Sequence, residues 1–133
     1  PTAGIGFAMG VERVVELLVH AGQAPAARPA DVYVVVSGAR ATAAGIGLVE
    51  RLRDELPARR FDLNLGGGNF KAQFRRADRS GAALALILGD DELARGVAGV
   101  KPLRNEAGQS ECPLPELAAA IEAAIAGAEA PAK

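Results

Sequence analysis

Val32-Tyr33-Val34-Val35-Val36 is the stretch that decides the fold, because it is apolar throughout and rich in β-branched residues. A half-exposed strand would alternate apolar and polar residues, whereas a strand inside a parallel sheet is covered on both faces. A similar apolar run follows at residues 82–88, and a shorter one at residues 61–65. These segments together predict a largely parallel sheet.

Helical periodicity separates these apolar runs, as β-α-β units require. Residues 41–56 place apolar side chains at helical spacing and charged side chains opposite, which predicts a helix that packs on the sheet. Three glycines at residues 66–68 predict a turn, after which Asn69 is a suitable N-cap for a helix that Gly81 ends. A short helix begins at residues 90–92, whose acids suit helix capping better than a cation site.

The C-terminal part of the body predicts a hairpin and a last helix. Residues 97–103 and 109–112 flank the turn-forming sequence Asn-Glu-Ala-Gly at residues 105–108, which predicts two antiparallel edge strands. An amphipathic helix follows from Leu114, with Gly127 as its expected C-terminal cap. The body is therefore expected to be an α/β fold, with a mixed sheet of about five strands and three main helices.

Both ends of the chain differ from this body. Residues 4–10 are apolar and glycine-rich and predict a strand, and residues 11–20 predict an amphipathic helix. Neither element can bury its apolar face alone, so we expect this segment to be poorly packed or held by a partner, and the chain to be a piece of a longer protein. Residues 23–30 have the composition of a linker, and residues 129–133 predict a disordered tail.

The charge balance excludes a polybasic protein. The 133 residues include 15 Lys and Arg against 16 Asp and Glu, so any nucleic-acid site must be a local patch. No apolar run approaches the roughly 18 residues that span a bilayer, and no leader sequence is recognisable, so we expect neither export nor a membrane partner. Cys112 is the only cysteine and His20 the only histidine, which favours structural roles for both and a reducing, cytoplasmic location.

Residues 6–14, Gly-Phe-Ala-Met-Gly-Val-Glu-Arg-Val, resemble the third signature motif of class II aminoacyl-tRNA synthetases, in the form typical of the histidyl enzymes. Residues 65–78, 85–96 and 100–104 resemble the C-terminal anticodon-binding domain of the same enzymes. The resemblance covers nearly the whole chain, and the combination of segments is much more specific than any one of them.

The resemblance implies a different role for each part of the chain. Residues 1–22 would be a catalytic-domain remnant of one strand and one helix, and residues 31–128 a class IIa anticodon-binding domain. The complete enzyme would be a homodimer that attaches histidine to its tRNA through histidyl-adenylate, using ATP and Mg²⁺. Arg13 would bind the γ-phosphate of ATP, and Gly10 would line the adenine pocket. The first and second class II motifs have no counterpart here, so we expect this chain alone to be inactive and to bind no cofactor or metal.

The helix after the three glycines carries a charged arc. A helical wheel places Phe70, Gln73, Phe74 and Ala77 on one side of this helix. The opposite arc is basic and consists of Lys71, Arg75, Arg76 and Arg79, which are expected to face solvent. A charged arc alone is usually solvated surface, but the resemblance favours contact with histidine tRNA, not with DNA. The aromatic residues, Tyr33 included, are expected in the core, so arginine planes and amides must recognise the bases. The predicted tRNA-binding residues are Asn64, Gly67, Gly68, Asn69, Lys71, Gln73, Arg75, Arg76 and Arg79.

Other functions stay open on the sequence alone. A synthetase-like protein could use this domain for regulation or for sensing uncharged tRNA, without aminoacylation. The threonyl, prolyl and glycyl enzymes share this type of domain, and only residues 6–14 favour histidine. An unrelated doubly wound domain for a small ligand gives no reason for the basic helix, and a dinucleotide fingerprint at residues 4–10 is disfavoured because position 9 is Met. If the charged arc does not bind RNA, residues 37–40 and 101–104 are the next candidates.

Overall fold

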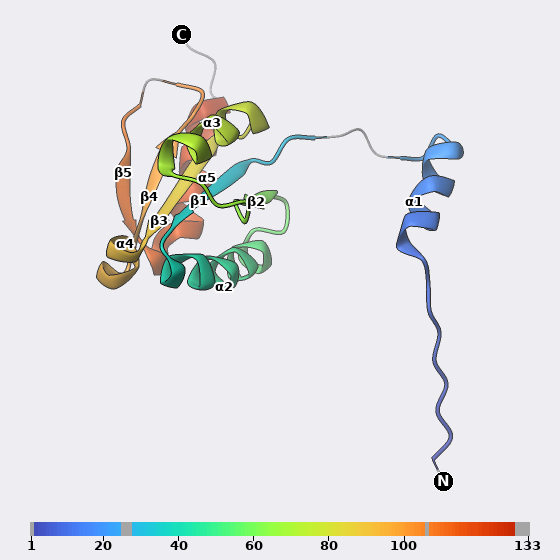
Figure 1. Ribbon diagram of the computed structural model, residues 1–133. Helices are drawn as coiled ribbons and strands as arrows, with labels where there is room; N and C mark the ends of the chain where they lie inside the picture. The colour runs from blue at the N-terminus through green and yellow to red at the C-terminus, as the bar shows by residue number, and fades with distance from the viewer. Residues whose placement is uncertain (1, 25–27, 106, 130–133) are drawn as a thin grey trace.

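A five-stranded sheet forms the centre of the body in the computed structural model, which describes residues 2–24, 28–105 and 107–129 (Figure 1). The strand order is β2-β1-β3-β4-β5, and the strands are β1 (Val32–Ser37), β2 (Phe61–Leu63), β3 (Leu84–Gly89), β4 (Val97–Pro102) and β5 (Ser110–Pro113). β1 pairs in parallel with β2 and β3, and the antiparallel β4–β5 hairpin extends the sheet beyond β3. The predicted mixed sheet, with a parallel core and a hairpin at one edge, is confirmed.

Helices cover both faces of this sheet, which explains why β1 is apolar throughout. The helices of the body are α2 (Ala39–Glu55), α3 (Phe70–Ser80), α4 (Asp90–Arg95) and α5 (Leu117–Glu129), and the 3-10 turn η1 (Leu114–Glu116) precedes α5. Val32 and Val34 belong to a core that includes residues of α2 and α5. Tyr33 and Val35 form a second core with Ala77 of α3. Successive side chains of a strand alternate between faces, so β1 needs apolar residues at every position.

The end of the last helix differs from the prediction. Gly127 does not cap the helix, because α5 continues to Glu129. The surrounding sequence is rich in alanine, which favours helix enough to accommodate one glycine in the last turn. The predicted disordered tail therefore begins with a helical residue, and residues 130–133 lie outside the described part of the chain. Residue 106 of the predicted hairpin turn lies outside it as well.

The N-terminal segment has no core of its own. α1 (Val11–His20) confirms the predicted helix, but the prediction of a strand at residues 4–10 is wrong, since residues 2–10 form no regular element. A strand needs a ladder partner, and no strand of the described chain pairs with these residues. Every residue from 2 to 24 is exposed, including Ile5 and Phe7, which confirms that the segment packs poorly on the body (Figure 1). Residues 25–27 of the predicted linker lie outside the described residues.

α1 is amphipathic and short. It has 10 residues, whereas a membrane-spanning helix needs about 20. Among the residues that the structure describes, no helix combines the length and the apolar character needed to cross a bilayer.

Candidate nucleic-acid interface

The polar residues singled out in the sequence gather where the parallel strands end. β1, β2 and β3 run in the same direction, so their carboxyl ends lie along one edge of the sheet. α2, α3 and α4 follow these strands and begin at this edge. α2 packs on one face of the sheet and α3 on the other, so the chain switches faces at β1. Open α/β sheets bind their ligands in the crevice at such a switch point.

The turn between β2 and α3 has the predicted geometry. Asn69 is the N-cap of α3, where its side-chain oxygen accepts a hydrogen bond from the Ala72 amide at 3.0 Å. Gly67 and Gly68 have φ angles of 59° and 95°, in the left-handed region that other residues rarely adopt. Gly81 ends α3 in the left-handed conformation, as predicted. The glycines thus form a turn whose backbone, without any Cβ atom, faces the start of α3.

Gln73 is buried and connects this glycine turn to β1 by hydrogen bonds. Its side chain is 1% exposed. The Oε1 atom accepts a hydrogen bond from the Val36 amide at 3.0 Å, and the Nε2 atom donates to the Val36 carbonyl at 2.7 Å. The same Nε2 donates to the Gly68 carbonyl at 2.9 Å. One amide therefore joins the carboxyl end of β1 to the glycine turn.

Asn64 and Arg76 hold the same turn from the other side. Arg76 Nη1 donates to Asn64 Oδ1 at 2.6 Å and to the Gly67 carbonyl at 2.7 Å. Asn64 Nδ2 donates to the Gly67 carbonyl at 3.2 Å, and the Tyr33 hydroxyl donates to Asn64 Oδ1 at 3.2 Å. Burial raises the pKa of the Tyr33 phenol, the charge of Asp62 adds to this shift, and Arg76 opposes it. We call Asn64, Gln73 and Arg76 the inner network.

The remaining cations of α3 lie on its outer face. Lys71, Arg75 and Arg79 are exposed and follow one another at intervals of four residues, so they form a single line along the helix. Within the described residues, no ion pair involves any of them, and the one side-chain hydrogen bond runs from Arg79 Nε to the Arg75 carbonyl at 3.2 Å. We call these residues the outer stripe. It is a local positive patch on a protein of net charge −1.

The structure thus divides the predicted tRNA-binding set. Lys71, Arg75 and Arg79 face solvent, as expected for phosphate contacts. Arg76 is half-buried, and its guanidinium donates to the Gly67 carbonyl, so it is less free to contact RNA than the other cations of α3. Gln73 and Asn64 are buried, and their amide groups bond to other parts of the protein. The sequence had suggested that these amides are exposed. RNA contact by the members of this set stays a prediction.

The three aromatic residues that were expected in the core are buried to different degrees. Tyr33 is buried as predicted, but Phe70 is 41% exposed because it is the first residue of α3 and lies at the rim of the sheet. Phe74 is half-buried, and the Lys101 ammonium lies 5.0 Å from the centre of its ring. Phe70 is therefore the exposed aromatic side chain at the carboxyl edge.

A hollow lies between the β1–α2 corner and the glycine turn. It has a volume of about 360 Å³, and its walls include Ser37, Thr42, Leu65 and Gly68. A second hollow of about 320 Å³ adjoins it, sharing Ser37 and Gly38 and reaching Phe70 and the start of α4. We call the first the carboxyl-edge hollow. The sequence prediction missed both hollows, although a Ser-Gly pair directly after a buried strand, with a glycine turn after the next, was an available signal.

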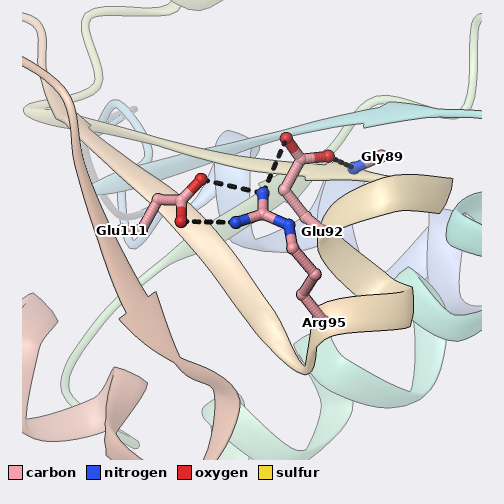
Figure 2. Close-up of polar contacts among 4 residues, drawn as sticks. All are labelled: Gly89, Glu92, Arg95 and Glu111. Carbon is pink, nitrogen blue, oxygen red and sulfur yellow. Dashed lines mark hydrogen bonds and ion pairs between the residues drawn. The ribbon is translucent and has the colours of Figure 1, made fainter.

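The acids at the start of α4 have structural partners. Figure 2 shows Glu92 accepting a hydrogen bond from the Gly89 amide at 2.9 Å, which closes the N-terminus of α4. Asp90 is not the N-cap of its own helix, because Gly89 has that position; Asp90 Oδ1 instead accepts from the Ala41 amide of α2 at 2.8 Å. Within the described residues, no cluster of His, Cys, Asp and Glu could hold a metal ion.

An ion pair ties α4 to the edge strand β5 (Figure 2). The Arg95 guanidinium donates two hydrogen bonds to the Glu111 carboxylate, at 2.6 and 2.8 Å. These bonds hold the pKa of Glu111 below its ordinary value and raise the pKa of Arg95. Both side chains are about half exposed, so this pair is a surface contact.

The residues predicted to bind ATP do not form an enclosed site by themselves. Gly10 and Arg13 are exposed, as is all of residues 2–24, so the described chain supplies no walls around a nucleotide there. His20 is exposed at the end of α1, like the rest of residues 2–24, and its structural role stays a prediction. Cys112 is buried as expected, and burial raises the pKa of its thiol.

Comparison with known proteins connects this geometry to a family. Residues 31–124 match the model of the anticodon binding domain family. The structure is also similar to histidyl-tRNA synthetase from Nostoc sp. PCC 7120, with 27% identity and a TM-score of 0.66 over 88% of this chain and 28% of that chain.

Two further structures share the fold. Apo histidyl-tRNA synthetase from S. aureus is 24% identical, with a TM-score of 0.63 over 84% of this chain and 28% of that chain. The RNA binding domain of threonyl-tRNA synthetase from Cryptosporidium parvum Iowa II is 10% identical, with a TM-score of 0.64 over 71% of this chain and 23% of that chain. The present chain therefore spans little more than a quarter of the length of the histidyl-tRNA synthetases that it resembles.

Proposed function

Because the chain belongs to the anticodon-binding domain family, we propose that its body binds the anticodon stem-loop of a tRNA, and specifically of histidine tRNA. The observation that carries this proposal is the outer stripe. Three exposed cations in one line on α3, without acidic partners in the described chain, suit the regularly spaced phosphates of an RNA backbone. The similarity to histidyl-tRNA synthetase from Nostoc sp. PCC 7120, at 27% identity, supports the choice of histidine.

The proposal extends to the parent protein, which would be a histidine–tRNA ligase. The exposed apolar residues of the N-terminal segment would be covered by the rest of a catalytic domain, where Arg13 would meet the γ-phosphate of ATP and Gly10 the adenine. ATP and Mg²⁺ would supply the activation of the histidine carboxylate in that complete site. We also propose that the parent protein is a cytoplasmic homodimer, as its resemblance to the histidyl enzymes implies.

Two assays separate the binding step from the reaction. The chain should bind a histidine anticodon stem-loop more tightly than the same stem-loop with a swapped anticodon. Equal binding of both would contradict the histidine assignment, and no binding of either would contradict the RNA-binding function. The 133-residue chain should show no histidine-dependent ATP–pyrophosphate exchange above an empty-vector control, because Gly10 and Arg13 alone cannot orient the reactants.

The reaction of the full-length protein distinguishes the ligase from the regulatory alternative. Arg13→Ala in the full-length protein should lower ATP–pyrophosphate exchange sharply and leave stem-loop affinity nearly unchanged. A full-length protein that binds the stem-loop but never aminoacylates would instead be a tRNA-sensing module.

A further inference from the structure

We propose that Arg60 is a positioning residue, which holds the end of the linker on the body and so sets the direction in which the N-terminal segment leaves. The inference rests on the proposed ligase function and adds how the RNA-binding body is aligned with the catalytic part of that protein. Residues 28–31 lead into β1 at the amino ends of the parallel strands (Figure 1). The glycine turn lies at the opposite edge of the sheet, where these strands end.

Hydrogen bonds on two sides fix Asp31, the residue before β1. The Arg60 carbonyl accepts hydrogen bonds from the Asp31 and Val32 amides, at 2.9 and 3.1 Å. Asp31 Oδ2 accepts a hydrogen bond from the Arg60 amide at 2.8 Å. On the other side, the Asp31 carbonyl accepts hydrogen bonds from the Ala83 and Leu84 amides, at 3.0 and 3.1 Å. Asp31 is therefore tied to the starts of both β2 and β3.

The Arg60 side chain extends this hold to the last residues of the linker. Its Nη1 atom donates a hydrogen bond to the Arg28 carbonyl at 2.9 Å. Pro29 lies close to Gly81, where an added Cβ atom would be 3.0 Å from the Pro29 Cβ. Proline has a fixed φ and restricts the residue before it to extended backbone, so residues 28 and 29 have little conformational freedom to lose. One side-chain hydrogen bond and one close contact therefore suffice to fix this stretch on the body.

The connection between α1 and this fixed stretch is short. At the end of α1, the Gln23 amide donates a hydrogen bond to the Leu18 carbonyl at 2.8 Å. The body holds the chain from Arg28 onward. The five peptide steps from Gln23 to Arg28 span at most about 18 Å. With so short a connection, the direction of the chain at Arg28 limits where α1 can lie relative to the body.

The outer stripe leads toward the same exit of the chain. Lys71 lies in the first turn of α3, and Arg79 lies about 12 Å further along at a rise of about 1.5 Å per residue. α3 ends at Gly81, beside Pro29 of the linker. An RNA backbone held along the stripe therefore runs toward the edge where the N-terminal segment leaves. A tRNA carries its anticodon and its amino-acid acceptor at opposite ends, so the direction of this exit determines whether the acceptor end meets the catalytic domain.

The test removes the side-chain hydrogen bond and keeps the backbone hydrogen bonds. Arg60→Ala loses the donor to the Arg28 carbonyl, but the amide and the carbonyl of residue 60 keep their bonds to Asp31 and Val32. Arg28→Ala is the matched control, because it removes an arginine charge at the same place and keeps the carbonyl acceptor. Both arginines are exposed, so neither change opens the core. Arg60→Lys keeps a cationic donor and should be closer to the wild type than Arg60→Ala.

The first measurement is NMR relaxation of the 133-residue chain, which needs no RNA. The backbone order parameter at residue 28 should be near the rigid value of about 0.85 in the wild type and in Arg28→Ala. In Arg60→Ala it should fall below about 0.6, the range of a flexible backbone. An order parameter at residue 28 that is the same in Arg60→Ala as in the wild type would overturn the inference, whatever the chain binds.

The second measurement uses the full-length protein and separates positioning from RNA contact. Arg60→Ala should lower the kcat of aminoacylation by about tenfold. It should leave histidine-dependent ATP–pyrophosphate exchange and stem-loop affinity at their wild-type values. Arg28→Ala should match the wild type in all three assays.

Three results of these assays would overturn the inference. Weaker stem-loop binding by Arg60→Ala, or an equal loss of kcat in Arg28→Ala, would show that the arginine charge contacts RNA. If the wild type aminoacylates and Arg60→Ala does so at the same rate, the inference fails and the proposed function stands. If the wild type does not aminoacylate, the proposed ligase function fails and the positioning role fails with it.

Discussion

The two faces of α3 carry similar residues in different surroundings. Arg76 and Gln73 of the inner network are bonded to the glycine turn and to β1, whereas Arg75 and Arg79 of the outer stripe lie in solvent on the same helix. A buried polar group without a partner is costly, so the inner residues must use their hydrogen bonds within the fold. An exposed cation has no such constraint and stays available to a phosphate. Residue type alone therefore does not assign a role on this helix.

The largest effect is expected from Gln73→Leu. The change leaves the Val36 amide and carbonyl without the partner that they have at 3.0 and 2.7 Å, and the free energy of unfolding should fall by about 2–4 kcal/mol. Gln109→Leu, on the exposed segment before β5, should change it by less than about 0.5 kcal/mol. Urea unfolding measures both. Equal stability of the two variants would show that the buried hydrogen bonds of Gln73 do not stabilise the fold.

Arg76→Ala and Arg75→Ala compare neighbouring arginines on the two faces. Loss of the Arg76 bonds to Asn64 and Gly67 should lower the free energy of unfolding by about 1–2 kcal/mol, whereas Arg75→Ala should lower it by less than about 0.5 kcal/mol. Thermal and urea unfolding of the pair measure the difference. If Arg75→Ala lowers the free energy of unfolding more than Arg76→Ala does, the assignment of Arg76 to the inner network and Arg75 to the outer stripe is contradicted.

A smaller effect is expected at alkaline pH. Burial raises the pKa of Tyr33, so the folded state keeps the phenolic proton above the unfolded value of about 10. Its contribution to stability is complete below about pH 10 and decreases as the pH rises further. Tyr33→Phe should make the unfolding free energy less sensitive to pH between about pH 9 and about pH 11. An unchanged slope would show that the Tyr33 proton is not linked to folding.

The smallest effect on the free energy of unfolding is expected from breaking the surface ion pair of Figure 2. Arg95 holds the pKa of Glu111 below its ordinary value, so the pair stabilises the fold above the unfolded pKa of Glu and loses its contribution as the pH falls through the folded value. Glu111→Gln should remove this acid dependence, and salt should weaken it in the wild type. If Glu111→Gln lowers the free energy of unfolding as much as Gln73→Leu does, the ranking of buried contacts above exposed contacts is contradicted.

Much of the fold could be predicted from local sequence. The apolar run at residues 32–36 identified a strand covered on both faces, and Asn69 and Gly81 marked the ends of α3. These features depend on neighbouring residues, which a sequence shows directly. The prediction of a strand at residues 4–10 was wrong because pairing is not local: the residue types suit a strand, but a strand also needs a partner elsewhere.

The site was predicted less completely because its parts meet only in the folded chain. The helical wheel already placed Gln73 on the inner side, and this signal should have counted against an RNA contact. Arg76 lies on the outer arc of the wheel, but its long side chain reaches back to the Gly67 carbonyl, which a wheel does not show. The carboxyl-edge hollow depends on the parallel register that brings the end of β1 beside the turn after β2.

The salt dependence of stem-loop binding tests the central claim, that the outer stripe holds the RNA backbone, most directly. If about three phosphates are neutralised, the logarithm of wild-type affinity should fall with the logarithm of salt concentration at a slope of about −2. Filter binding across a salt series should give the double variant Arg75→Ala/Arg79→Ala a slope flatter by about 1.4, with its anticodon preference retained. Arg13→Ala, which removes an exposed charge outside the body, should leave the slope unchanged. A double variant that keeps both the affinity and the slope of the wild type would contradict the account.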